Sequence, residues 1–468
     1  MLAHVPTAET ERLLLTELSD LYSGHFELLS NEGRYAEAFQ VIEKAHGRIE
    51  AQELEFDHTE APHALTADEG QLQALEVALV NSNPKDDKGK FLHQIRLAAV
   101  SSGNAPRETT TPLTQLQSSL KPNELFIEYV LAVPHSYALA ITSSTVKQHI
   151  LPPKDLIEAE AGKYREILSK QKTDPKLGSE IFDHVLNFLG EYPQATSLIV
   201  VPDGSLHLLP FSALITGNGK YLFEVEPTSI APSGTVLWLL RGRPPEPAGS
   251  LPYLGVVAFT MPSDPRPWIV RAASPQSTEL IPLPESRNEV ESIGAMMPQP
   301  STILLGSGAT KKKFQDLPLG NYRVVHLALH GFVDPVFPDK SAIVFAPSGS
   351  DNGRLEARDI RQLHLHADLV TLSACDTAVG PVGTSGVESV VAGFVQAGAS
   401  SVVATLWELE DHASNKFMKA FYTHLQKVGK AEALRQAKLD SLHMGLPPYY
   451  WASYEIVGDS QGPPFPPK

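Results

Sequence analysis

Cysteine is almost absent from this chain, since its 468 residues include one, Cys375. A single cysteine excludes an intrachain disulfide, and it excludes metal sites that are built from several thiolates. Because proteins of reducing compartments rarely carry disulfides, we expect a cytoplasmic location. The N-terminus does not combine positive charge with an apolar run, so we expect no secretory signal.

Long apolar runs and an excess of basic residues are also missing. No stretch reaches about 18 consecutive apolar residues, so we expect no membrane-spanning helix and no membrane partner. Acidic residues number 54 against 38 basic ones, and the net charge is −16 at pH 7. Because nucleic-acid backbones are bound by basic surfaces, we expect no nucleic-acid partner. The chain is 42% hydrophobic, which is enough to build sizeable cores in several domains.

Two common catalytic motifs are missing as well. Residues 306–311, GSGATK, carry glycines and a lysine but lack the spacing of both phosphate-binding glycine motifs. We expect them to form a turn that leads into a helix. No G-x-S-x-G sequence is present, which argues against a serine hydrolase of the α/β type. A nucleotide-dependent enzyme is therefore disfavoured, and we expect no cofactor and no bound metal.

The first 56 residues are predicted to form a pair of helices. Apolar residues recur at helical spacing before and after a break at residues 31–33. The segment 33–38, GRYAEA, followed by Ala45, resembles the second half of a tetratricopeptide repeat, although Phe26 stands where that repeat prefers a small residue. An ordinary helical hairpin explains the pattern equally well.

From Leu120 onward, strand and helix patterns alternate. Short apolar runs bounded by turn residues predict buried strands, and longer amphipathic stretches predict helices between them. This alternation is typical of an α/β fold with a parallel sheet. A Pro-rich stretch at 243–252 divides the pattern into two consecutive α/β units. Strands are predicted at 125–130, 137–141, 146–151, 197–201, 254–259, 324–329, 342–346, 368–373, 401–406 and 452–457, and helices at 155–190, 285–297, 388–396, 413–425 and 431–443.

Two of the predicted strands end in residues that can carry chemistry. One apolar strand runs into His330 and Gly331, and another runs into Cys375 and Asp376. In open α/β sheets, functional groups lie beyond the carboxyl ends of the strands. If these strands are parallel neighbours, both side chains reach the same edge of the sheet. Cys375 follows His330 by 45 residues, close to the separation of about 50 that is quoted for caspases.

A thiol and an imidazole at one sheet edge can form a nucleophile and its base. The thiolate is the attacking form, and free cysteine has a pKa near 8.5, so a cysteine nucleophile needs a nearby base. His330 would accept the thiol proton and pass it to the leaving amine. The backbone N–H groups of Gly331 and Cys375 would form an oxyanion hole. Taken alone, however, a cysteine at a strand end is more often a small buried residue.

Longer motifs give this pair a family context. The informative stretches are 198–204 (LIVVPDG), 209–214 (LPFSAL), 230–233 (IAPS), 283–284 with 289–290, 325–331 (VHLALHG), 372–378 (LSACDTA), 402–407 (VVATLW) and 450–454 (YWASY). On these motifs the sequence resembles the CHAT family, caspase-like domains that accompany tetratricopeptide repeats. The resemblance covers roughly residues 115–459. It implies a caspase-like fold of the clan that also contains caspases, separase and gingipains.

The residue patterns and the resemblance together divide the chain. Residues 1–56 would form the helical, tetratricopeptide-like hairpin, and residues 57–114 a helix and a linker. Residues 115–245 would form a degenerate caspase-like subdomain, residues 250–460 the CHAT protease domain, and residues 461–468 a Pro-rich tail. The expected fold class is therefore α/β and caspase-like, with a degenerate half and a protease half after a short helical segment.

The implied activity is that of a cysteine endopeptidase that cleaves protein or peptide substrates. The family's catalytic dyad maps onto His330 and Cys375, and Asp376 replaces the glutamate that usually follows the cysteine. Asp376, Trp407 and Glu408 are candidates to line a substrate pocket, and an acidic pocket would favour Arg or Lys. Acidic loop residues are, however, mostly just solvated. Further acidic candidates are Glu388, Glu410 and Asp411.

A second function stays open on the sequence alone. A non-catalytic scaffold, caspase-like in fold and with tetratricopeptide-like helices, would bind other proteins without cleaving them. The intact dyad argues against a pure scaffold, which has no need of a thiol beside an imidazole. For the protease, we expect regulation through the N-terminal helical region, by a protein that binds there.

Overall fold

Short runs of apolar residues form the central strands of this protein, and these runs join in one sheet. In the computed structural model, the described residues contain an 11-stranded sheet. Across the sheet, the strands are β3 (Val146–Leu151), β2 (Ser136–Ile141), β1 (Glu124–Val130), β4 (Ser197–Val201), β5 (Thr228–Ile230), β18 (Tyr454–Gly458), β17 (Ser401–Thr405), β14 (Leu369–Leu372), β10 (Tyr322–Ala328), β6 (Leu251–Val257) and β9 (Ser301–Leu305). The structure describes residues 19–46, 51, 54, 110–243, 250–258, 268–270, 278–280, 283–333, 338–373, 382–383, 386–387 and 390–465.

The sheet combines two blocks of strands that run in opposite directions. β1, β4, β5 and β18 are parallel to one another, and so are β17, β14, β10, β6 and β9. The blocks meet where β17 pairs antiparallel with β18. The two α/β units of the chain meet at a different place in the sheet, between β5 of the first unit and β18 of the second. There, Ile230 of β5 lies opposite Val457 of β18. The two units therefore share one continuous sheet.

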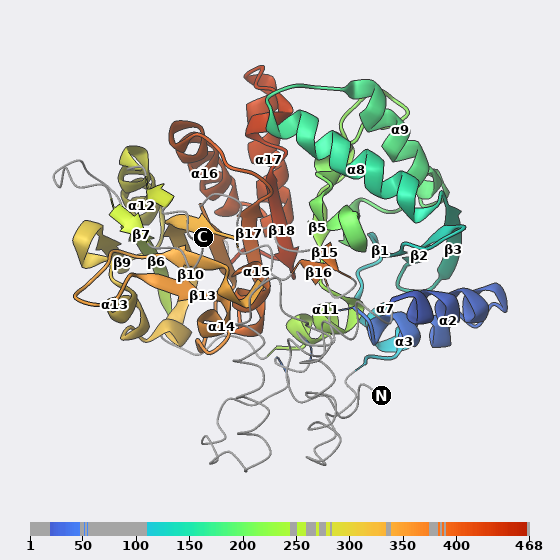
Figure 1. Cartoon of the computed structure of the whole chain (residues 1–468), viewed down its shortest axis with the longest axis horizontal. Coiled ribbons are helices and arrows are strands. Elements are labelled where there is room, and N and C mark those ends of the chain that lie inside the picture. Colours follow the sequence, from blue (N-terminus) through green and yellow to red (C-terminus); the bar gives the residue numbers. More distant parts are fainter. Residues whose placement is uncertain are drawn as a thin grey trace, which may run out of the picture.

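Helices cover both faces of the sheet, as Figure 1 shows. Alternate residues of β1 belong to two different cores: Phe126 packs with the N-terminal helices, and Ile127 packs with α8 and α9. This double cover explains why all of β1 is buried. The helices are α2 (Ser19–Asn31), α3 (Tyr35–Glu43), α7 (Leu113–Ser119), α8 (Lys154–Ser169), α9 (Pro175–Val185), α10 (Leu222–Val225), α11 (Gly234–Arg241), α12 (Pro284–Met296), α13 (Lys311–Gln315), α14 (Ala357–Ile360), α15 (Val390–Gln396), α16 (Asp411–Leu425) and α17 (Lys430–His443).

Smaller elements complete the fold. A three-stranded antiparallel sheet follows β10, and two short hairpins lie elsewhere in the second unit. Their strands are β11 (His330–Phe332), β12 (Ala342–Val344) and β13 (Arg354–Glu356), then β7 (Trp268–Val270) with β8 (Thr278–Leu280), and β15 (Val382–Gly383) with β16 (Gly386–Val387). Short 3₁₀ helices are η2 (Asn187–Glu191), η3 (Gly204–Leu208), η4 (Phe211–Ala213), η5 (Gly306–Gly308), η6 (Leu319–Asn321), η7 (Pro338–Lys340) and η8 (Pro448–Tyr450).

The N-terminal helices dock firmly on the first α/β unit. Gly33 has a positive φ of 73°, which lets the chain turn sharply between α2 and α3. At the end of α3, the buried carboxylate of Glu43 accepts hydrogen bonds from the N–H groups of Gly234 (2.6 Å) and Thr235 (2.7 Å). These N–H groups open α11, where they have no acceptor within the helix, so the carboxyl group of Glu43 supplies one. The helical segment is thus tied to the sheet by a buried contact.

The predicted fold class is confirmed: a large, mostly parallel sheet in an α/β arrangement follows N-terminal helices. The helical stretch predicted over 155–190 is present, and the chain divides it into α8, α9 and the short η2. Asp174 accepts a hydrogen bond from the N–H of Leu177, and Pro175 occupies the first helical position, so a new helix begins. The predicted turn before Lys311 is confirmed, since η5 leads into α13.

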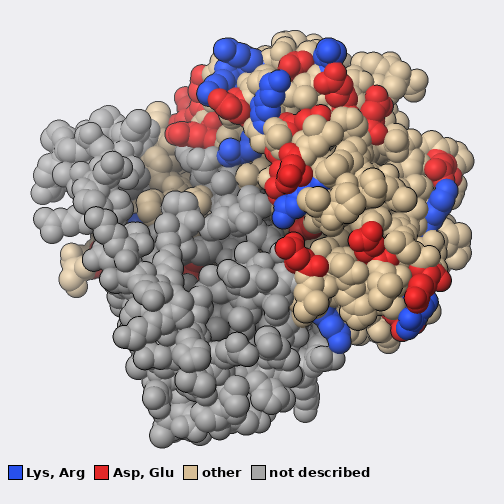
Figure 2. Space-filling model, turned by 45° about the vertical axis from the view of Figure 1, so that its right-hand side comes forward, with Lys and Arg blue, Asp and Glu red and all other residues tan. Residues whose placement is uncertain are grey.

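The described surface carries charges of both signs. Figure 2 shows Lys and Arg side chains interspersed with Asp and Glu over the described part of the visible face, without a continuous basic patch.

None of the helices in the described ranges combines the length and the apolar character that crossing a membrane requires.

Candidate functional site

The strand ends predicted to carry chemistry do lie at one edge of the sheet. β10 pairs parallel with β14, with Leu327 opposite Leu372, and β14 pairs parallel with β17. Parallel neighbours end at the same edge, so the residues after Ala328, Leu372 and Thr405 all emerge there. This edge therefore collects the segments that contain most of the candidate residues.

His330 stands where the chain leaves the large sheet and enters the small one. It opens β11, where it lies opposite Val344, and the next residue, Gly331, lies opposite Ile343. His330 is nearly buried, with 9% of its surface exposed, whereas Gly331 is partly exposed. The pairing with β12 fixes the backbone of both residues. His330 is thus held in a defined position that solvent still reaches.

Cys375 and Asp376 lie outside the described residues, but the chain that leads to them is anchored. The N–H of Ser373 donates to the carbonyl oxygen of Leu327 at 3.0 Å, which continues the pairing of β14 with β10. The hydroxyl of Ser373 lies 3.0 Å from that of Ser414, which in turn lies 3.0 Å from the hydroxyl of Tyr454. The backbone two residues before Cys375 therefore runs beside β10.

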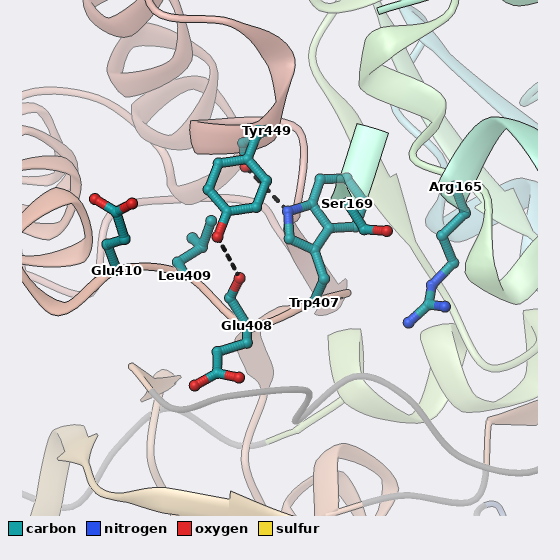
Figure 3. A pocket seen from close by; sticks show the side chains of 7 residues that line it. All are labelled: Arg165, Ser169, Trp407, Glu408, Leu409, Glu410 and Tyr449. Carbon is teal, nitrogen blue, oxygen red and sulfur yellow. Dashed lines mark hydrogen bonds between the residues drawn. The ribbon is translucent and has the colours of Figure 1, made fainter. Parts of the chain in front are cut away.

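Trp407 and Glu408 contribute to a pocket at the carboxyl end of β17 (Figure 3). Its volume of roughly 470 Å³ lies within the range of about 300–1,000 Å³ that is common for ligand pockets. The first α/β unit supplies one wall from α8, and the second supplies the rest. The lining residues are Arg165, Ser169, Trp407, Glu408, Leu409, Glu410 and Tyr449.

Backbone acceptors hold the pocket walls in place. The indole N–H of Trp407 donates to the carbonyl of Tyr449 at 3.0 Å, and the hydroxyl of Tyr449 donates to the carbonyl of Glu408 at 3.0 Å. Across the pocket, Nη2 of Arg165 donates to the carbonyl of Leu406 at 2.8 Å. Burial raises the pKa of Tyr449, which keeps its hydroxyl protonated as a donor. These three hydrogen bonds fix the orientations of the Trp407, Tyr449 and Arg165 side chains.

The acidic candidates divide between the pocket and other places. Glu408 and Glu410 are exposed side chains of the pocket lining. Asp411 instead holds the start of α12, because its carboxylate accepts hydrogen bonds from the N–H of Glu285 (2.7 Å) and the hydroxyl of Ser286 (2.8 Å). Glu388 lies outside the described residues.

Sequence reasoning missed the part of the pocket that comes from the first unit. Arg165 lies 241 residues before Leu406, its hydrogen-bond acceptor, and no local motif marks it. A helix that packs across two units leaves no spacing signal in the sequence, so only the fold could reveal this wall.

A second buried cluster lies in the first unit, at the end of β4. The ring of His46 contacts Glu128 at 3.2 Å and Asp203 at 3.8 Å. Burial lowers the pKa of His46, but the two carboxylates outweigh burial and raise it to about 10. All three side chains are buried, so this cluster joins the N-terminal helices to the sheet and is closed to substrate.

No set of three or more His, Cys, Asp or Glu side chains within the described ranges is arranged to hold a metal ion.

Comparisons with known proteins give this arrangement its context. Human tetratricopeptide repeat protein 28 is 26% identical over an alignment of 310 residues, which covers 56% of this chain and 12% of that protein, and the mouse protein gives the same values. The chain thus matches only a small part of the length of these curated relatives.

The chain is also similar in fold to solved structures, among them two whose sequence identity to it is lower than that of the repeat protein. Separase in the Saccharomyces cerevisiae separase–securin complex is 11% identical, with a TM-score of 0.45, 93% of this chain covered and 37% of that chain. The Arg-specific cysteine proteinase gingipain R is 9% identical, with a TM-score of 0.40, 66% of this chain covered and 74% of that chain.

The family comparison covers more of the molecule. Residues 168–459 match the CHAT domain. That range begins near the end of α8, so it includes Ser169 but not Arg165 of the α8 wall, the rest of the pocket lining, and every strand from β4 to β18. Since the match extends over more than half of the 468 residues, the chain belongs to the CHAT domain family.

Proposed function

We propose that this protein is a cysteine endopeptidase of the caspase-like type, in which Cys375 is the nucleophile and His330 is its base. The observation that carries the proposal is the parallel pairing of β10 with β14. The pairing brings His330 and Ser373, which lies two residues before Cys375, to one edge of the sheet, and this supports the proposal. Membership of the CHAT family supports the same assignment.

In the proposed reaction, His330 accepts the thiol proton and the thiolate of Cys375 attacks the carbonyl carbon of the scissile peptide bond. The backbone N–H groups of Gly331 and Cys375 would stabilise the oxyanion. His330 then gives its proton to the leaving amine as the C–N bond breaks. Water, activated by His330, hydrolyses the thioester and restores the thiol. A reducing compartment such as the cytoplasm would keep this thiol available.

We propose that the Trp407 pocket receives a side chain of the protein or peptide substrate. Glu408 and Glu410 place two carboxylates at the rim, which favours a basic side chain by charge pairing. Asp376 would add a third carboxylate from the segment after the nucleophile. The apolar part of a long substrate side chain would lie against Leu409.

The N-terminal helices are the proposed site of regulation. Leu21 and Leu28 are 67% and 60% exposed and lie seven residues apart, on one face of α2. A regulatory protein bound there would reach the first α/β unit through the buried contact of Glu43. Exchanging both leucines for serine should leave the activity of the isolated chain unchanged and remove its response to such a partner.

The test of the proposed function uses the unique cysteine. A peptide library should be cleaved by the wild-type chain and left intact by Cys375→Ala and by His330→Ala, both of which should keep the wild-type melting temperature. Full activity in Cys375→Ala would refute the mechanism. An electrophilic peptide probe that fails to label Cys375 at neutral pH, with and without a partner, would favour the non-catalytic scaffold.

A further inference from the structure

A buried chain of four polar side chains connects the two strands that lead to His330 and Cys375. Oε1 of Glu289 in α12 lies 2.9 Å from Nε2 of His326 in β10. Nδ1 of the same ring lies 3.1 Å from the hydroxyl of Tyr422 in α16, and that hydroxyl lies 2.8 Å from Oγ1 of Thr371 in β14. All four residues are fully buried. We call this set the Glu289 network.

The Glu289 network has a fixed relation to the proposed dyad. His326 and Thr371 are direct partners in the pairing of β10 with β14. His326 lies four residues before His330, and Thr371 lies four residues before Cys375. One hydroxyl, that of Tyr422, therefore contacts both strands at the same distance along the chain from the two proposed catalytic residues.

The donors and acceptors of the network can be assigned in one consistent direction. The hydroxyl of Thr371 donates to Tyr422, the hydroxyl of Tyr422 donates to Nδ1 of His326, and Nε2–H of His326 donates to Oε1 of Glu289. Removing any member leaves a buried polar group without its partner.

Stability alone does not explain such a network. Oε2 of Glu289 has no hydrogen-bond partner among the described residues, although it is buried. Buried polar networks that are only partly satisfied are usually less stable than apolar packing of the same volume. The network does, however, fix the spacing and register of β10 and β14, because Glu289 in α12 and Tyr422 in α16 bind side chains of these strands.

We propose that the Glu289 network is a positioning device for the dyad: it holds β10 and β14 in register and so fixes His330 relative to the strand that leads to Cys375. This inference rests on the proposed function. Its residues do not touch substrate, so they act through the strands. A displacement of about 1 Å at a catalytic group can cost up to about 100-fold in rate, so a small relaxation here has a measurable effect.

The unique cysteine makes the test specific, because every alkylated thiol is Cys375. The rate of iodoacetamide alkylation is measured from pH 5 to pH 10 for the folded full chain. Tyr422→Phe removes only the bridging hydroxyl. Its matched control is Tyr129→Phe, which removes an equally buried hydroxyl, bonded to the carbonyl of Val185 at 2.9 Å in the first unit.

We expect His330→Ala to move the alkylation profile toward the pKa of about 8.5 that a free thiol shows. Tyr422→Phe should move it in the same direction, lower the alkylation rate at neutral pH by about 3- to 10-fold, and lower kcat without changing KM. Tyr129→Phe loses one buried hydrogen bond, whereas Tyr422→Phe loses two; Tyr129→Phe should therefore also lose stability, but it should keep the wild-type alkylation profile. Thr371→Val, which removes the hydroxyl, should behave as Tyr422→Phe does. Thr371→Ser, which keeps the hydroxyl, should keep the wild-type alkylation profile.

Three outcomes separate the two proposals. A shift in Tyr422→Phe that is absent in Tyr129→Phe supports the positioning role. If His330→Ala shifts the profile but Tyr422→Phe matches Tyr129→Phe, the positioning role is overturned and the dyad stands. If His330→Ala leaves the profile unchanged, the dyad is overturned and the positioning role with it.

Discussion

His46 and Glu128 are 82 residues apart in the chain, yet Nδ1 of His46 lies 3.2 Å from Oε1 of Glu128 in the buried contact between the N-terminal helices and the sheet. Asp203 and Glu43 lie in the same cluster, and so does His207, which burial keeps neutral by lowering its pKa to about 4. Burial and the charge of Glu128 raise the pKa of Glu43 to about 8. The cluster therefore couples protonation to the docking of α3.

The first prediction concerns the pH dependence of stability. Since the pKa of His46 is raised from 6.5 to about 10, its contribution is fully present below pH 6.5 and is lost as the pH rises through 10. The raised pKa of Glu43 acts in the same direction, over the range from 4.5 to about 8. The free energy of unfolding should thus fall between pH 6.5 and pH 10. His46→Gln should flatten this dependence in denaturant titrations, and the exposed His135→Gln should not. If the unfolding free energy depended on pH equally steeply in His46→Gln and in His135→Gln, the raised pKa of His46 would not be the cause of the dependence.

A second prediction concerns a link across the two units. The guanidinium of Arg241 contacts Glu124 at 2.8 Å and Asp459 at 3.2 Å, and it donates to the carbonyl of Ser119 at 2.8 Å. Because Glu124 is buried, Arg241→Met leaves an uncompensated charge and should cost about 3–5 kcal/mol of unfolding free energy.

The control for Arg241 is an exposed arginine with two ion pairs. Arg34 contacts Glu32 at 3.0 Å and Glu37 at 2.6 Å, with 48% of its side chain exposed. Arg34→Met should cost much less unfolding free energy than Arg241→Met, because solvent screens exposed ion pairs. Comparable losses for the two variants, measured by urea unfolding, would show that the Arg241 contacts are not buried in solution.

The third prediction concerns the charge of the pocket. If Glu408 and Glu410 select a basic substrate side chain, the double variant Glu408→Gln, Glu410→Gln should lower kcat/KM for Lys- or Arg-containing peptides by about tenfold relative to neutral peptides. Glu166→Gln, on the exposed side of α8, is the control and should leave the ratio unchanged. An unchanged ratio in the double variant would remove these carboxylates from substrate selection.

A fourth prediction contrasts two glycines. A methyl group on Gly255 in β6 would lie 2.5 Å from Cγ1 of Val290 in α12, so Gly255→Ala should destabilise the second unit by about 1–3 kcal/mol. Gly162, in the interior of α8, faces open space, so Gly162→Ala should stabilise the chain by about 0.5–1 kcal/mol. Thermal unfolding should give melting temperatures that move in opposite directions. A shift in the same direction would contradict the packing of α12 on β6.

Much of the fold could be predicted because its central strands are continuous apolar runs. The run from Ser197 to Val201 is typical of a strand that is buried on both faces, and it forms β4 over those residues. β5 was not predicted, because three residues, Thr228–Ile230, are too few to show a period. β9 was not predicted either: Ser301–Leu305 begins with two polar residues and is only partly buried at every position.

The candidate site, too, could be predicted from the sequence only in part. His330 could be predicted because an apolar strand leads directly into it. The contacts of Tyr422 could not, since α16 reads as an ordinary amphipathic helix and the partners of its hydroxyl lie 51 and 96 residues away. Side chains that meet only through tertiary packing leave no local signal, and the Glu289 network is made entirely of such contacts.

The position of β18 has a consequence for how the molecule is made. β18 follows every other strand in the sequence, yet it lies between β5 and β17, in the interior of the sheet. During synthesis, the edge of the first unit at β5 and the edge of the second unit at β17 stay open until the chain through Gly458 has left the ribosome. Closing such a long-range contact is slow compared with local folding. The complete sheet, and with it the proposed cleavage activity, can therefore form only after the second unit has been translated through Gly458.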